Sequence, residues 1–152
     1  KWREIKGPEF LEGSIEGLKR LKEMGYYFII ITNQYLINDG IISLNDYQQF
    51  TGKFLKKLKE ENIDILKIYF CPHNEKDHCH CKKPKPGMIE QAKKDFLIDM
   101  NNSIYIGDSH VDYLLAKHFN LTFYGINYHD DNVKSYHSIL DISKQIKKIQ
   151  NK

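Results

Sequence analysis

A chain of 152 residues is long enough for one domain with a buried core and short for two. Its apolar residues make up 41% and its charged residues 28%, as in an ordinary globular protein, and no apolar run approaches the roughly 20 residues of a membrane helix. The formal net charge of +3 argues against bulk binding of nucleic acid. We therefore expect a single domain over residues 1–152 with neither a membrane nor a nucleic-acid partner.

The first part of the chain predicts a helix, a strand and a second helix. Apolar residues recur at helical spacing over 8–26, and Gly25 suits a C-terminal cap. The aromatic and β-branched run 26–32 lacks alternation, as expected of a strand that is covered on both faces. Ser43 and Asp46 form a start signal for the next helix. Its apolar positions are Tyr47, Phe50, Phe54 and Leu58.

The second part of the chain continues the alternation of strand and helix. We expect strands at 65–70, 103–107 and 121–126. Helices are expected at 88–96, at 111–119 and, from the spacing of Ile139, Ile142, Ile146 and Ile149, at 139–149. Short connections between alternating elements are typical of an α/β domain with a parallel sheet.

Polar residues gather where the predicted strands end. In parallel sheets, ligands bind beyond the carboxyl ends of the strands, so these residues should face one crevice. The three groups are Thr32, Asn33 and Gln34; Cys71 and His73; and Gly107, Asp108 and Ser109.

The loop after the second strand carries every cysteine of the chain. Cys71, His73, Cys79 and Cys81 supply four N/S ligands, the number that a closed tetrahedral zinc site takes. The alternative of inert buried thiols is weakened by the polar neighbours, which offer little apolar material for burial. His78 and His80 are alternative ligands. An odd number of clustered cysteines does not suit a disulfide framework, so we expect a structural zinc and a reducing, cytoplasmic location.

Three lysines follow this loop directly. Lys82, Lys83 and Lys85 could be solvated surface charges. An ammonium on a loop that a metal ion holds still is also a good clamp for a phosphoryl group at the mouth of a crevice. The position of these lysines next to the predicted zinc ligands favours the second interpretation.

The other two strand ends also fit phosphate chemistry. Asp108 and Asp112 could hold Mg²⁺, or they could be a helix cap and a first-turn charge. A threonine hydroxyl and nearby backbone N–H groups at Thr32 and Asn33 could cradle phosphate oxygens, or this dipeptide could be a simple turn.

Taken together, "FIIITNQ", "CPHNEKDHCHCKKPKPGM" and "SIYIGDSHVD" resemble the second, third and fourth motifs of the haloacid dehalogenase (HAD) superfamily of phosphatases. The zinc loop is similar to that of the branch holding heptose 1,7-bisphosphate phosphatase and histidinol-phosphate phosphatase. The resemblance implies a Rossmann-like parallel sheet between helices, without a large cap domain. It also implies a phosphomonoesterase that acts on a small phosphorylated metabolite. Separately, we expect a monomer.

The resemblance assigns a role to each candidate residue. Thr32 would bind the transferring phosphoryl group and Lys83 would neutralise its charge. Mg²⁺ would be held by Asp108 with support from Asp112, and Zn²⁺ by the four loop ligands. The substrate-binding residues would be Asn33, Gln34, Lys82 and Ser109.

Three departures from the superfamily pattern qualify this interpretation. No Asp-x-Asp, the source of the nucleophile, occurs in the chain, so we expect a sequence that lacks its N-terminal first strand rather than an inactive phosphate-binding or regulatory domain. Lys82 stands where the family usually has an arginine, and Tyr35 and Leu36 stand where the heptose enzymes usually have Ser-Gly. These two differences leave the substrate open between a sugar bisphosphate and histidinol phosphate. A zinc-containing nucleic-acid-binding module is the third hypothesis.

Overall fold

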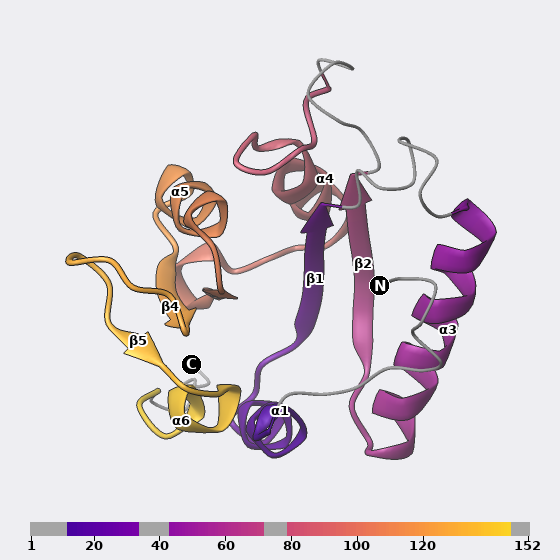
Figure 1. The fold of residues 1–152 in the computed structure, drawn as a ribbon, viewed down its shortest axis with the longest axis horizontal. Helices are drawn as coiled ribbons and strands as arrows, with labels where there is room; N and C mark the ends of the chain where they lie inside the picture. The colour runs from indigo at the N-terminus through magenta and orange to yellow at the C-terminus, as the bar shows by residue number, and fades with distance from the viewer. Residues whose placement is uncertain (1–11, 34–42, 72–78, 147–152) are drawn as a thin grey trace.

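The computed structural model describes residues 12–33, 43–71 and 79–146, and these residues form an α/β fold (Figure 1). The strands are β1 (Phe28–Asn33), β2 (Ile65–Cys71), β3 (Ile104–Gly107), β4 (Thr122–Ile126) and β5 (Ser135–Tyr136). The helices are α1 (Ser14–Glu23), α3 (Leu44–Glu60), α4 (Gly87–Asp95), α5 (His110–His118) and α6 (Ile139–Ser143), with a short 3-10 turn, η3 (Met100–Asn102), before β3. None of the helices in these ranges is long and apolar enough to cross a membrane.

The strands are parallel, as predicted, but they form two sheets. β1 pairs with β2 from Phe28 opposite Ile65 to Asn33 opposite Cys71. β3, β4 and β5 form the second sheet in that order. Within the described residues, β1 is paired only with β2, and β3 only with β4. Figure 1 shows the two groups of strands standing apart, with α4 above them.

Helix α4 connects the two sheets through apolar packing. Met88 and Ala92 are buried in a cluster with Tyr69 and Cys71 of β2, and Ile89 is buried in a second cluster with β3 and α5. Ile31 of β1 packs against both clusters. Because one helix and one strand residue contribute to both cores, the two sheets belong to a single packed unit.

The first helix packs closely on the last one, at the bottom of Figure 1. A Cβ on Gly17 would lie 2.4 Å from the backbone carbon of Ile139, so the helices can approach this closely only at a glycine. The predicted helix over 139–149 is wrong at residues 144–146, because α6 ends at Ser143, and residues 147–149 lie outside the described residues. The Ser143 hydroxyl donates to the Leu140 carbonyl and accepts from Arg20 Nε at 3.0 Å, and such side-chain bonds compete with helix continuation.

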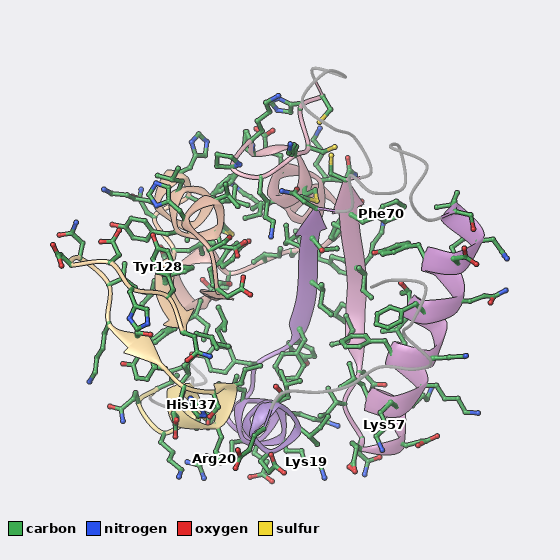
Figure 2. All side chains as sticks on the ribbon, viewed as in Figure 1. Lys19, Arg20, Lys57, Phe70, Tyr128 and His137 are labelled. Atoms are coloured by element: carbon green, nitrogen blue, oxygen red, sulfur yellow. The ribbon has the colours of Figure 1, made fainter. Side chains whose placement is uncertain are left out.

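Helix α3 begins where the sequence predicts. The Ser43 hydroxyl accepts a hydrogen bond from the backbone N–H of Asp46 at 3.0 Å, which is an N-terminal cap. The buried ring of Tyr47 lies 5.0 Å from that of Phe70 on β2, on the side of the strand that faces α3 (Figure 2).

Candidate active site and metal-binding loop

The site begins at the carboxyl ends of β1 and β2. Asn33 and Cys71 are the last residues of these strands and lie opposite each other in the sheet. Thr32, one residue earlier, is opposite Phe70 and is partly buried. The first predicted phosphate-binding residues and the first predicted zinc ligand are therefore neighbours.

Lys83 is attached to the end of β1 through its backbone and its side chain. Its backbone N–H donates to Asn33 Oδ1 at 2.9 Å, and its ammonium donates to the Ile31 carbonyl at 3.4 Å. The peptide bond between Lys83 and Pro84 is cis. Asn33, which the sequence assigns to substrate binding, therefore also positions the lysine.

The ammonium of Lys83 also forms an ion pair with Asp112 of α5, the helix that follows β3. Its Nζ lies 2.7 Å from Asp112 Oδ1, and only 12% and 7% of the two side chains are exposed. The Tyr105 hydroxyl donates to the same oxygen at 2.8 Å, and the Ser109 hydroxyl donates to Asp112 Oδ2 at 2.8 Å. The ion pair therefore joins the loop after β2 to the start of α5.

These donors control the ionisation of Asp112. Burial alone would raise the pKa of this carboxyl group, but the hydrogen bond and the positive charge of Lys83, with help from Tyr105 and Ser109, lower it below its ordinary value. Burial and the carboxylate raise the pKa of Tyr105 far above its ordinary value, so its hydroxyl remains a donor. Asp112 is thus a charged group at neutral pH whose carboxylate accepts three side-chain hydrogen bonds.

Glycine at the end of β3 allows Asp112 to lie so close. A Cβ on Gly107 would come within 2.6 Å of Asp112 Cβ and 2.8 Å of its carboxylate. Tyr105 was not predicted as a site residue, because a tyrosine in a strand usually belongs to the core. Asp112 lies in the first turn of α5, which begins three residues after the end of β3, and this short connection is the signal that could have indicated the contact.

Three of the four predicted zinc ligands lie together. The sulfur atoms of Cys71, Cys79 and Cys81 are all within 4.8 Å of one another, and those of Cys71 and Cys79 are 3.4 Å apart. Sulfurs around a tetrahedral zinc ion lie about 3.8 Å apart, given Zn–S bonds of about 2.3 Å. The cluster therefore fits zinc, and all three cysteines are free thiols. His73 and the alternative ligand His78 lie outside the described residues.

The environment of Cys79 favours the thiolate. Burial raises the pKa of this thiol, but hydrogen bonds from the backbone of Lys82, from the Cys71 thiol and from the Cys81 backbone lower it to about 6. Thiolates are the form in which cysteine binds metal ions.

The segment from Cys79 to Gly87 is folded back on itself. Lys85 Nζ donates to the Cys79 carbonyl at 2.7 Å, and the Gly87 N–H donates to the His80 carbonyl at 3.0 Å. His80, the second alternative zinc ligand, instead contacts Glu90 Oε1 through Nε2 at 2.8 Å. Lys82 is partly buried, and its carbonyl accepts from the Lys85 N–H at 2.8 Å.

Three further predicted residues, Asp108, Asp112 and Ser109, lie at the second sheet. Asp108 follows β3 directly and is exposed, whereas Asp112 is buried in the ion pair. Ser109 caps α5, because its hydroxyl also accepts from the Asp112 N–H at 3.4 Å. The magnesium roles of Asp108 and Asp112 and the substrate role of Ser109 stay predictions. Gln34 lies outside the described residues.

Two comparisons of sequence identify similar proteins. A family model described as polynucleotide kinase 3 phosphatase matches residues 8–143. A D-glycero-alpha-D-manno-heptose-1,7-bisphosphate 7-phosphatase of Photorhabdus laumondii is 45% identical over 112 residues, which are 68% of this chain and 61% of that protein. A D-glycero-beta-D-manno-heptose-1,7-bisphosphate 7-phosphatase of Pasteurella multocida is 40% identical over 120 residues, which are 75% of this chain and 65% of that protein. The chain thus spans less than two thirds of either relative.

A solved structure has the same fold. The D,D-heptose 1,7-bisphosphate phosphatase of B. bronchiseptica, complexed with magnesium and phosphate, superposes with a TM-score of 0.80 over 89% of this chain and 82% of that one. The sequence identity is 20%, so this likeness supports the fold and not the chemistry. The predicted α/β, HAD-like architecture is confirmed.

Proposed function

Because the chain belongs to the polynucleotide kinase 3 phosphatase family, within the HAD superfamily, we propose that it contributes the phosphate-binding part of a Mg²⁺-dependent phosphomonoesterase. The substrate is a small phosphorylated metabolite, with a sugar bisphosphate such as heptose 1,7-bisphosphate first and histidinol phosphate second. The observation that carries the proposal is the buried ammonium of Lys83 at the carboxyl end of β1.

Lys83 has the properties of a phosphoryl clamp. An ammonium has three donors, and the contacts with Ile31 and Asp112 use two of them. The third donor is available for a phosphoryl oxygen beside Thr32 and Asn33. Because the side chain is mostly buried, its charge acts in a medium that screens it less than water does, and this strengthens charge stabilisation during transfer.

Asp108 and Asp112, the two carboxylates at this edge, would contribute differently to a magnesium site. The exposed carboxylate of Asp108 suits an ion that keeps several waters and takes one or two carboxylates. Asp112 supports the site by holding Lys83, since its oxygens already accept from Lys83, Tyr105 and Ser109. The ion would neutralise charge on the transferring phosphoryl group.

Zinc would serve a structural role in this enzyme. We propose Cys71, Cys79 and Cys81 as three ligands and His73 as the fourth. Lys83 follows Cys81 by two residues, so an ion held by the cysteines would fix the start of the loop that carries the ammonium. A closed site with four protein ligands leaves no open position for catalysis.

We propose that the nucleophile comes from outside these 152 residues, because they contain no Asp-x-Asp. We propose that an extended segment with two carboxylates, spaced two residues apart, inserts between β1 and β3. In the described structure each of these strands is paired on one side only, and both are parallel to their partners. Parallel insertion would bring the carboxylates to the edge where Lys83 lies.

The cysteines also bear on the location of the protein. All three are thiols in a cluster, and a reducing compartment such as the cytoplasm keeps them so. We propose a cytoplasmic monomer, which analytical ultracentrifugation of the full-length protein would test.

The decisive experiment is hydrolysis by the full-length protein with and without Mg²⁺. The substrates are heptose 1,7-bisphosphate, histidinol phosphate, p-nitrophenyl phosphate and a 3′-phosphorylated oligonucleotide. Magnesium-dependent turnover of a small ester supports the proposal. Turnover of none would favour an inactive phosphate-binding domain, and preference for the oligonucleotide would favour a nucleic-acid enzyme.

A further inference from the structure

A second polar network lies on the other side of the start of α5. His110 Nδ1 lies 2.9 Å from the Tyr128 hydroxyl, which donates to Asp130 Oδ2 at 3.3 Å. A phenol has one proton, and here it points to Asp130, so the Tyr128 oxygen accepts from His110 Nδ1–H. In the neutral ring this leaves the lone pair on Nε2.

The network is held in place by its own loop. Asp130 Oδ1 accepts from the Asn132 N–H at 2.8 Å, and the Asn127 N–H donates to the Tyr136 carbonyl at 2.8 Å. The Tyr128 ring packs edge-on against Phe123, with centroids 5.9 Å apart. Desolvation and the charge of Asp130 raise the pKa of Tyr128, which keeps the phenol protonated as a donor.

This network shares an edge of the fold with Lys83. His110 is the first residue of α5 and follows Ser109. Tyr128, which Figure 2 labels, comes two residues after the end of β4. Residues two apart on a helix point to different sides, so Asp112 is directed to Lys83 and His110 to Tyr128. His110 is exposed, and its ring lies 6.2 Å from that of Tyr113.

We propose that His110 and Tyr128 form a subsite for the hydroxyl-bearing part of the phosphate ester. The inference rests on the proposed function, because it assumes that the phosphoryl group is held at Lys83. An ester whose alcohol part crosses the start of α5 meets the acceptor His110 Nε2 and the edges of the tyrosine rings. A polyol offers both hydroxyl donors and C–H faces to such a surface, whereas an aryl group offers no hydroxyl.

The test compares two substrates of the full-length protein, heptose 1,7-bisphosphate and p-nitrophenyl phosphate. His110→Ala should raise KM for the sugar ester about tenfold, as the loss of one hydrogen bond and its contacts implies, with little change in kcat. For p-nitrophenyl phosphate kcat/KM should stay unchanged. Tyr128→Phe, which keeps the ring but frees His110 Nδ1, should raise KM for the sugar ester by a smaller factor.

The matched control is His118→Ala, which removes an exposed histidine from the last residue of the same helix. It should leave all constants unchanged. An unchanged KM for the sugar ester in His110→Ala would overturn the subsite, and so would an equal loss on both substrates.

Inhibition by inorganic phosphate separates this inference from the function on which it rests. Phosphate probes only the Lys83 site, so its inhibition constant should be the same in the wild type and in His110→Ala. Absence of phosphate inhibition in the wild type would count against the proposed function. Normal phosphate inhibition with an unaltered sugar KM in His110→Ala would count against the subsite alone.

Discussion

The ammonium of Lys83 and the carboxylate of Asp112 lie 2.7 Å apart, although 29 residues separate them in the sequence. The pair links the loop after β2 to the first turn of α5, and both side chains are mostly buried. The pair fixes the position of the Lys83 ammonium. Among the described residues, this ammonium is the only candidate that lies between the two sheets and could bind the phosphoryl group. Four predictions follow from this relationship and from the loop that leads to it.

Removing one member of the pair should be costly. Lys83→Met leaves Asp112 buried without its counter-charge, which typically destabilises a protein by about 3 kcal/mol. Lys83→Met combined with Asp112→Asn should recover part of this loss, because no unpaired charge remains. Urea unfolding of Lys83→Met, Asp112→Asn, the double variant and the wild type measures both effects. If the double variant were as unstable as the sum of the single variants, the two groups would not be coupled.

Acid should remove the stabilisation that Asp112 provides. Its pKa is lowered in the folded state, so its contribution to the free energy of unfolding is complete above the unfolded-state value of about 4. The contribution decreases as the pH falls through the lower, folded-state pKa. The difference in stability between the wild type and Asp112→Asn should therefore shrink below about pH 4. Urea midpoints at neutral pH and near pH 3 measure it, and a difference independent of pH would contradict the assignment.

The cysteine cluster should bind about one zinc ion per chain. Cys79→Ser should release the metal, while His80→Gln should retain it, because His80 contacts Glu90 and does not belong to the cluster. Elemental analysis of the purified variants gives the zinc content. The same measurement on His73→Ala and His78→Ala identifies the fourth ligand. Full zinc content in Cys79→Ser would exclude the proposed site.

A methyl group at the end of β3 should disturb the ion pair. Gly107→Ala places a Cβ within 2.6 Å of Asp112 Cβ, so the carboxylate must shift and its bonds to Lys83 and Tyr105 must weaken. Gly52→Ala is the matched control, since a Cβ there meets nothing within 4 Å and alanine favours the helix by about 1 kcal/mol. Thermal unfolding should show a lower midpoint for the first variant and an equal or higher one for the second.

Sequence patterns predicted most elements because their signals are local. The apolar run of β1 and the Ser43 cap of α3 depend only on neighbouring residues. β5 was missed because two residues carry no periodicity, and the strand exists only through its pairing with Gly125 and Ile126. The helix predicted over 139–149 was wrong at 144–146, because Ile146 continues the apolar spacing although α6 has already ended at Ser143.

The candidate site was predictable by residue type but not by contact. The sequence placed Asp108 at a strand end and Lys83 directly after the predicted zinc loop, and the cysteine spacing predicted the cluster that the sulfur positions support. It assigned Asp112 to magnesium, while the structure adds that Asp112 binds Lys83 directly. Such a pair depends on how two distant segments pack, which neither spacing nor composition encodes.

The most direct test of the account is the dissociation constant for inorganic phosphate of the full-length protein at saturating Mg²⁺, measured for the wild type and for Cys79→Ser. If zinc holds the loop that presents Lys83 to the phosphoryl group, loss of the metal should weaken phosphate binding by about tenfold or more, as expected when a charge-assisted hydrogen bond is lost. Equal phosphate affinity in a folded, zinc-free Cys79→Ser protein would contradict the account.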